Sequence, residues 1–135
     1  MNDYSLVSKN TPLISNLNML ENIALIKEVH QFIKTSSAQK EALYYLSKID
    51  LQNVGKNRLT QCTSLEIFYI SFIRALMTKE MNVIILTPFH LIDNLRDIET
   101  VLASIQKLEI KKNILILDTF SNETHYKGCS CNIIK

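Results

Sequence analysis

Few side chains in this 135-residue sequence are placed where they could do chemistry. Asp118 is the best-placed acid, because it follows an apolar run that has the pattern of a buried strand, and such an acid can act as a base or bind a cation. However, no second carboxylate or base stands beside Asp118, and this favours a turn or capping role over a chemical one. His90 follows the other apolar run and is either a polar functional residue or a loop side chain. His30 lies on a mostly apolar helix face, which indicates packing rather than ligand binding.

The three cysteines form the only other candidate site. Cys129 and Cys131 make a C-x-C pair that could bind a metal with two further ligands, and His125 is the only nearby candidate. Cys62 is distant in sequence. The odd number and wide spacing favour reduced thiols in a cytosolic protein over a metal site.

Composition restricts the classes of protein that are possible. Hydrophobic residues make up 47% and charged residues 21%, which is typical of a globular domain, and the length favours a single domain over residues 1–135. The formal net charge is +2 and no dense basic cluster is present, so we expect no nucleic-acid partner. The apolar runs are too short to span a bilayer and the N-terminus lacks the pattern of a secretion signal, so a cytoplasmic location is expected.

The first half of the chain predicts a short strand followed by two helices. Residues 3–8 alternate as in a strand, and 9–12 have turn chemistry. Asn18 with Glu21 forms a capping box that opens a helix extending to about Lys34. Ser36 with Gln39 has the same pattern for a second helix, and the two predict a helical hairpin. The apolar stripe of the second helix is Ala42, Leu43, Leu46 and Ile49. Residues 50–60 are polar and predict a surface loop.

The second half predicts a buried helix between strands. Thr63 with Glu66 forms another capping box, and the helix that follows is apolar on nearly all sides, as an interior helix should be. The runs 83–86 and 114–117 both predict buried strands. Asp93 is placed to cap the helix between these runs, which makes a right-handed β-α-β unit. The fold class is therefore α/β with a parallel sheet, and ligand sites in such sheets lie at the carboxyl ends of the strands.

This order of elements resembles the later part of an ABC-type ATP-binding cassette domain, from about Tyr4 to Ile134. The segment Lys9-Asn10-Thr11-Pro12-Leu13 is similar to the glutamine loop of the family, with Lys9 in place of the glutamine. The continuation from Leu17 to Ile23 resembles the family's T-V-x-E-N-I helix start. The resemblance implies two parts. Residues 1–16 and 63–135 would form a partial P-loop NTPase-like parallel sheet, and residues 17–62 would form a helical hairpin subdomain.

The signature segment of the family, L-S-G-G-Q/E, is similar to the residues from Cys62 to Glu66, with Arg74 in the following A-R-A-L stretch. Thr63 and Glu66 fall within the motif, but Ser64 and Leu65 occupy the places of both glycines. In the family these glycines permit close approach to the γ-phosphate of a nucleotide that is bound to the partner subunit. We therefore expect the side chains at these positions to crowd that approach.

The Walker B strand and D-loop of the family, l-l-l-D-E-P-x-x-x-L-D, resemble the stretch from Ile84 to Asp93. Leu86 and Thr87 replace the magnesium-binding aspartate and the catalytic glutamate. Leucine cannot coordinate Mg²⁺, and threonine cannot act as a general base near neutral pH. Thr119, after Asp118, stands where the family places its switch histidine. No G-x-x-x-x-G-K-[ST] phosphate loop occurs in these residues.

The resemblance thus implies a catalytically degenerate, N-terminally shortened cassette without its own ATP or Mg²⁺ site. Such a chain would be a non-hydrolysing interaction subunit of a membrane transport complex, cytoplasmic or peripheral on the inner face of the membrane. Its partners would be a membrane permease subunit, a full-length cassette or a second copy. Two alternatives stay open. The chain could complete an ATP site together with a separate chain that carries the phosphate loop, or it could be a small unrelated α/β enzyme that uses Asp118, His90 or the C-x-C thiols.

Overall fold

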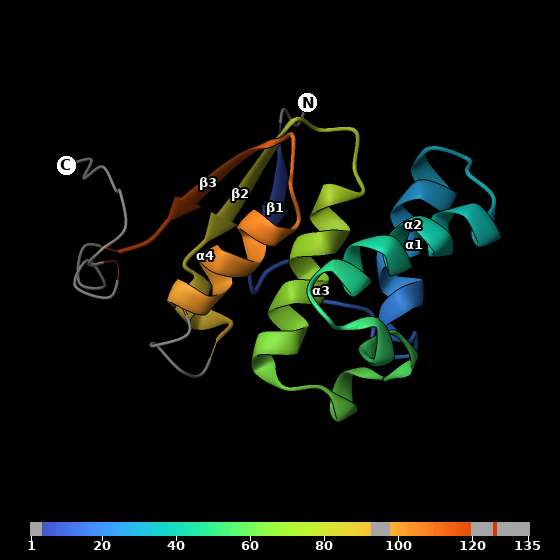
Figure 1. The fold of residues 1–135 in the computed structure, drawn as a ribbon, viewed down its shortest axis with the longest axis horizontal. Coiled ribbons are helices and arrows are strands. Elements are labelled where there is room, and N and C mark those ends of the chain that lie inside the picture. Colours follow the sequence, from blue (N-terminus) through green and yellow to red (C-terminus); the bar gives the residue numbers. More distant parts are fainter. Residues whose placement is uncertain (1–3, 93–97, 120–125, 127–135) are drawn as a thin grey trace.

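The computed structural model describes residues 4–92, 98–119 and 126, and within them helices alternate with parallel strands (Figure 1). This arrangement confirms the predicted α/β class. The elements, in chain order, are β1 (Ser5–Val7), α1 (Met19–His30), α2 (Thr35–Lys48), η1 (Gln52–Lys56), η2 (Leu59–Gln61), α3 (Ser64–Leu76), β2 (Asn82–Leu86), η3 (Pro88–His90), α4 (Ile98–Lys107) and β3 (Asn113–Leu117), where η marks a 3₁₀-helix.

The described strands form one parallel sheet in the order β1-β2-β3. Val7 pairs with Ile85, and Ile85 with Ile116, so these three side chains share one face of the sheet. The helix α4 connects β2 to β3, which confirms the predicted parallel β-α-β unit. Because the strands are parallel, their carboxyl ends meet at one edge of the sheet.

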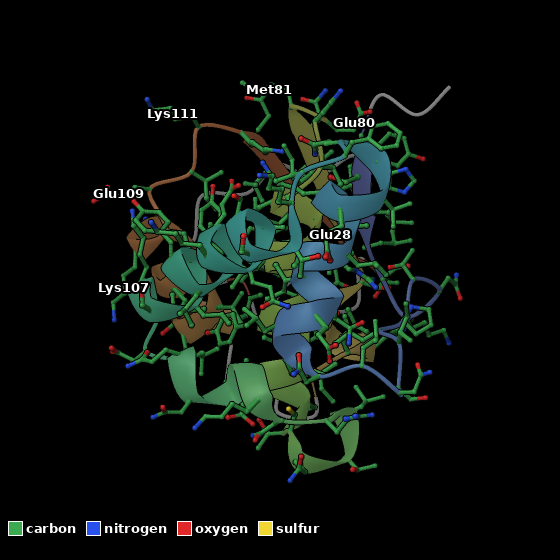
Figure 2. The ribbon with its side chains drawn as sticks, turned by 90° about the vertical axis from the view of Figure 1, so that its right-hand side faces the viewer. Glu28, Glu80, Met81, Lys107, Glu109 and Lys111 are labelled. Atoms are coloured by element: carbon green, nitrogen blue, oxygen red, sulfur yellow. The ribbon has the colours of Figure 1, made fainter. Side chains whose placement is uncertain are left out.

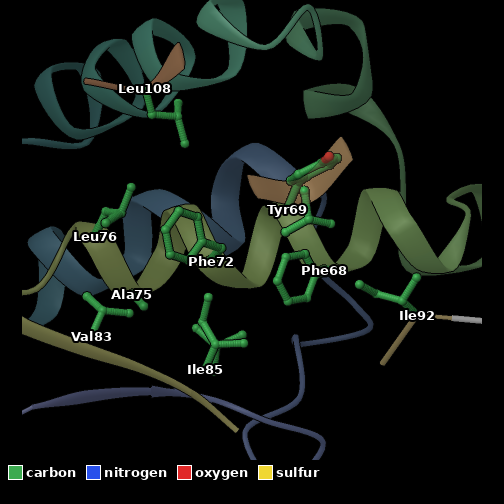
Figure 3. Packing of buried hydrophobic residues seen from close by; sticks show 11 residues of the cluster. Phe68, Tyr69, Phe72, Ala75, Leu76, Val83, Ile85, Ile92 and Leu108 are labelled. Atoms are coloured by element: carbon green, nitrogen blue, oxygen red, sulfur yellow. The ribbon is translucent and has the colours of Figure 1, made fainter. Parts of the chain in front are cut away.

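The helix α3 is the centre of the packing. It contacts the sheet on one side and the α1–α2 hairpin on the other (Figure 1). Phe68 and Phe72 are almost completely buried, and their rings stack with centroids 6.5 Å apart (Figure 3). Ile70 and Ile73, on the opposite side, pack within the hairpin cluster. The prediction of an interior helix is therefore confirmed. Each large apolar side chain buried in this way contributes about 1.5–3 kcal/mol to stability.

The capping boxes that open α1 and α3 are both present. The Asn18 side chain accepts a hydrogen bond from the Glu21 backbone N–H, and the Glu21 carboxylate accepts one from the Asn18 N–H. Asn22 is 2% exposed and exchanges hydrogen bonds with both backbone groups of Ile14. These contacts hold the connector from the first strand against the start of the hairpin.

The predicted ends of the hairpin helices were wrong in two places. The helix α1 ends at His30 rather than near Lys34, because Phe32 adopts a left-handed conformation with φ 56° and the Ile33 N–H bonds back to the Lys27 carbonyl. Ser36 does not cap α2. The helix begins at Thr35 and no side chain makes a capping hydrogen bond there.

Two burial predictions for the hairpin region were also wrong. Leu43, predicted within the apolar stripe of the second helix, is 43% exposed, and Ala38 is buried instead. The segment 50–60 is not a plain surface loop, because η1 and most of η2 lie in it. Val54 and Gly55 are buried, and a Cβ on Gly55 would lie 3.5 Å from the Leu20 Cβ. This distance is an ordinary van der Waals contact, so η1 packs against the hairpin but does not require a glycine at this position.

The strand β3 is not buried on both faces, contrary to the prediction. Leu115 is 51% exposed and Leu117 is 38% exposed, while Ile114 and Ile116 pack against the core cluster around α3. Figure 1 shows α4 over one face of the sheet. The cap predicted at Asp93 lies outside the described residues. Among the residues that the structure describes, no helix has the length and apolar character needed to cross a bilayer.

Candidate functional site at the carboxyl edge of the sheet

The carboxyl end of β2 is formed by Leu86 and Thr87. Leu86 is half-buried and pairs with Leu117 of β3. The Thr87 backbone N–H donates to the Leu117 carbonyl at 2.6 Å, which continues the ladder one residue past the strand. The Thr87 side-chain oxygen lies 3.1 Å from Nδ1 of His90. Parallel α/β sheets bind their ligands at the carboxyl ends of the strands. At that edge, β2 presents the apolar side chain of Leu86, the hydroxyl of Thr87 and the imidazole of His90.

Thr87 has a strained backbone. Its φ is 44° and its ψ is 65°, in the left-handed region that is a true outlier for a β-branched residue. The turn that follows fixes this conformation, since the N–H of His90 donates to the Thr87 carbonyl and the N–H groups of Leu91 and Ile92 donate to the carbonyl of the buried Pro88. The turn holds the hydroxyl and the imidazole together. Neither Leu86 nor Thr87 supplies a carboxylate here, and the imidazole of His90 is the group of this turn that can accept a proton.

Asp118 directly follows β3 at the same edge. Its Oδ2 accepts a hydrogen bond of 2.7 Å from the Tyr126 hydroxyl, and its Oδ1 accepts one of 2.7 Å from the Thr119 N–H. The Tyr126 ring also lies edge-on to the Phe89 ring, with centroids 5.8 Å apart. Asp118 is thus engaged in local contacts, in accordance with the turn role that the sequence allowed.

The loop after β1 is anchored by Arg74 of α3. The guanidinium donates to the Pro12 carbonyl at 3.0 Å and also to the Thr11 carbonyl. Burial lowers the pKa of Arg74, and carbonyl acceptors compensate its loss of water contacts. Lys9 lies in the turn that follows β1 and is exposed. Because β1 is parallel to β2, Lys9 is at the same edge of the sheet as Thr87.

The residues of the signature-like segment form the start of α3. The Thr63 side chain accepts a hydrogen bond of 3.2 Å from the Glu66 N–H, and Glu66 Oε1 accepts one of 2.9 Å from the Thr63 N–H. Glu66 therefore caps the helix with its carboxylate. Ser64 and Leu65 follow in the first turn and are half-buried. Cys62, just before the cap, is a free thiol whose pKa is raised by burial and by the nearby Glu66 carboxylate.

The structure places the predicted site residues in two groups. Lys9, Thr87, His90, Asp118 and Thr119 belong to the carboxyl edge, and Thr63, Ser64 and Glu66 belong to the α3 N-terminus. His30 is exposed at the end of α1, so it is not an interior histidine.

The predicted thiol site and the D-loop aspartate are not covered by the structure. Asp93, His125, Cys129 and Cys131 lie outside the described residues. Within 4–92, 98–119 and 126, no three His, Cys, Asp or Glu side chains gather in a way that could hold a metal ion.

Sequence reasoning missed Phe89 and Tyr126 at this edge. Phe89 lies between Pro88 and His90, and nothing in its spacing predicted a contact with another aromatic residue. Tyr126 lies eight residues beyond Asp118 in a polar tail. A contact across that separation leaves no periodic or capping signal in the sequence. The edge therefore contains an aromatic pair in addition to its polar groups.

Comparison with known proteins points to one fold. No protein-family model and no curated protein sequence matches this chain. Among solved structures, the post-hydrolysis dimer of the ATP-binding cassette MJ0796, bound to ADP and Pi, matches with a TM-score of 0.66 at 20% identity, over 89% of this chain and 54% of that one. The dimeric structure of MJ0796, a bacterial ABC transporter cassette, matches with a TM-score of 0.66 at 17% identity, over 91% of this chain and 56% of that one. The chain spans about half the length of these structures, and it has the fold of the matching part of an ATP-binding cassette.

Proposed function

We propose that this chain is a cassette-like interaction subunit of a membrane transport complex and does not hydrolyse ATP by itself. The observation that carries the proposal is the end of β2. Leu86 is paired into the sheet and the Thr87 hydroxyl is beside His90, so neither position offers a carboxylate to Mg²⁺ or to an attacking water. Without a carboxylate here, neither Leu86 nor Thr87 can hold the Mg²⁺ or act as the carboxylate base on which phosphoryl transfer in this family relies.

The start of α3 supports the same proposal. In the family that the sequence resembles, this helix start approaches a phosphate of nucleotide on a partner, which requires close backbone access. Here Ser64 and Leu65 stand at the places of the two glycines, and both are half-buried in the first turn of α3. Their side chains would crowd the close backbone approach that the glycines permit.

The proposed location and partners follow from this role. The subunit would be cytoplasmic, or peripheral on the inner face of the membrane, and would bind a permease subunit or a full-length cassette through its helical hairpin subdomain, residues 17–62. A second copy of the chain is a further possible partner. This role needs no cofactor, and ATP and Mg²⁺ would bind only under the alternative in which a partner completes the site.

A second function is favoured by one specific observation, the unpaired outer edge of β3 in the described sheet. A chain that adds a strand there could bring a phosphate loop to the carboxyl edge and complete an ATP site across two polypeptides. Isothermal titration calorimetry separates the two functions. The first predicts no heat of Mg-ATP binding by the chain alone at millimolar concentration, and no heat in a mixture with a cassette partner beyond that of the partner by itself. The second predicts additional Mg-ATP binding in the mixture only, and binding by the chain alone would refute both.

A further inference from the structure

A hollow of about 320 Å³ lies at the amino ends of β2 and β3, at the opposite end of the sheet from Thr87 and Asp118. We name it the amino-edge hollow. It is lined by the second half of α2, the end of α3, Met81 and residues 108–112. Figure 2 shows Met81, Lys111 and Glu109 around it, beside α2. The volume is at the lower end of the range of pockets that hold small molecules in proteins.

The surface of the amino-edge hollow is largely apolar and aromatic. Leu76 and Leu108 line it and are buried in the core cluster around α3. Tyr44 and Met81 also line it, and each is more than half exposed. A tyrosine ring offers a flat apolar surface, and a methionine side chain adapts its shape to what it contacts. These residues favour a ligand with a small, flat, apolar body.

The charges around the amino-edge hollow are mostly positive. Lys48, Lys111 and Lys112 line it together with one acid, Glu109, so the formal charge is three minus one, or +2. Lys111 is exposed and makes no ion pair with any residue that the structure describes. A concave surface with charges of one sign attracts ligands of the opposite sign. The hollow is therefore suited to an anion rather than to a neutral ligand or a cation.

Lys112 has hydrogen-bonding capacity left for such an anion. Its ammonium donates to the Thr78 carbonyl at 2.6 Å and to the Glu80 carbonyl at 2.7 Å. An ammonium has three N–H donors, and the third has no acceptor within the described part of the chain. Burial lowers the pKa of Lys112, and the charge of Lys27 acts in the same direction. A negative group in the hollow would stabilise the charged form of Lys112.

The amino-edge hollow already holds one carboxylate, that of Glu109. Its Oε2 lies 3.5 Å from Nζ of Lys48, which in turn lies 4.8 Å from the centroid of the Tyr44 ring. Glu109 is in the left-handed region with φ 51°, and its side chain is 79% exposed. An exposed ion pair contributes little to stability, and a glycine would adopt this backbone without strain. Stability therefore does not explain a glutamate at this position.

We propose that the amino-edge hollow binds a small aromatic carboxylate, whose ring lies on the apolar floor beside Tyr44 and whose carboxylate displaces Glu109 from Lys48. This inference goes beyond the proposed function and does not depend on it. Because the hollow joins α2 of the hairpin to the segments that precede β2 and β3, the bound ligand would hold the hairpin against the sheet.

NMR titration of the isotope-labelled 135-residue chain with 2-naphthoate tests the proposal. We expect saturable shifts of the amide signals of residues 44–48 and 108–112 at millimolar concentration. The neutral analogue 2-naphthylmethanol should bind about fivefold more weakly or not at all, because it lacks the charge. Equal affinity for both compounds, shifts confined to the exposed side of residues 114–117, or no saturable shift would overturn the proposal.

Two substitutions in the hollow should change the affinity for 2-naphthoate in opposite directions. Glu109→Gln removes the competing carboxylate and should tighten binding about two- to fivefold, whereas Lys48→Met should weaken it about fivefold or more. Lys48→Arg keeps the charge and should retain most of the affinity. Lys107→Met, exposed on α4 and outside the lining, is the matched control and should leave the affinity unchanged.

The effect of Glu109→Gln is the sharpest of these outcomes, because a variant that merely disturbed folding could not bind more tightly. Weaker binding by Glu109→Gln, or equal losses in Lys48→Met and Lys107→Met, would refute the assignment of the carboxylate to Lys48. Far-UV circular dichroism of each variant checks that the helices are retained.

Discussion

Replacement of Phe32 by glycine should stabilise the protein. Phe32 has φ 56°, a conformation that costs a residue with a Cβ about 1–2 kcal/mol, and its ring is 89% exposed. Loss of the ring therefore removes almost no buried surface. Glycine adds freedom to the unfolded chain at a cost of about 0.4–1 kcal/mol. The balance is a gain of about 0.5–1 kcal/mol, which corresponds to a rise in Tm of roughly 2–4 °C for a chain of this length.

Urea unfolding followed by circular dichroism measures this change in the free energy of unfolding. Phe32→Ala is the matched control, because it removes the ring but keeps the Cβ, and it should not stabilise. Val29→Gly, inside α1, should destabilise by roughly 0.5 kcal/mol through helix propensity. The reasoning fails if Phe32→Gly lowers the free energy of unfolding by more than about 0.5 kcal/mol, since the ring would then have to make contacts within the fold.

Three further predictions concern charged groups and a thiol. Arg74→Leu should lower the free energy of unfolding, measured by urea titration, by about 2–4 kcal/mol, because the Thr11 and Pro12 carbonyls lose a charged donor. A loss below about 0.5 kcal/mol would contradict the anchoring role of Arg74. The Lys112 ammonium donates to the Thr78 and Glu80 carbonyls. Burial lowers the pKa of Lys112, so the folded state binds the ammonium proton less tightly than the unfolded state does. The stability of the wild type relative to Lys112→Met should therefore rise with pH in the window between the lowered pKa and 10.5, and a fall in that window would refute the assignment. In a Cys129→Ser, Cys131→Ser background, the alkylation rate of Cys62 should have its pH midpoint above 9.0, and a midpoint below that value would contradict the raised pKa.

Local patterns predicted the starts of helices well where one capping arrangement was possible. The pairs Asn18 with Glu21 and Thr63 with Glu66 are three residues apart before an apolar run, and both boxes formed. The cap predicted at Ser36 did not form, because the helix begins one residue earlier, at Thr35. The end of α1 could not be predicted, because the left-handed residue there is a phenylalanine rather than a glycine.

Burial depends on what packs from elsewhere in the chain, so it was predicted less well. The apolar run of β3 indicates a strand made to be covered on both sides, and the prediction of the strand itself was confirmed. The exposure of Leu115 could not be read from the run, since it depends on which elements reach that face.

The candidate site was predicted in part. The position of Leu86 and Thr87 at the strand end follows from the apolar run and the proline after it. The left-handed Thr87, its contact with His90, and the approach of Tyr126 to Asp118 are properties of the folded turn and tail. No spacing rule in the sequence indicates these contacts.

Phosphate release from Mg-ATP by the purified 135-residue chain is the most direct test of the central claim that the end of β2 no longer supports hydrolysis. The account predicts a rate equal to that of buffer alone, for the wild type and for His90→Ala alike. Mg²⁺-dependent release that follows the protein through a second purification step and disappears in His90→Ala would contradict it.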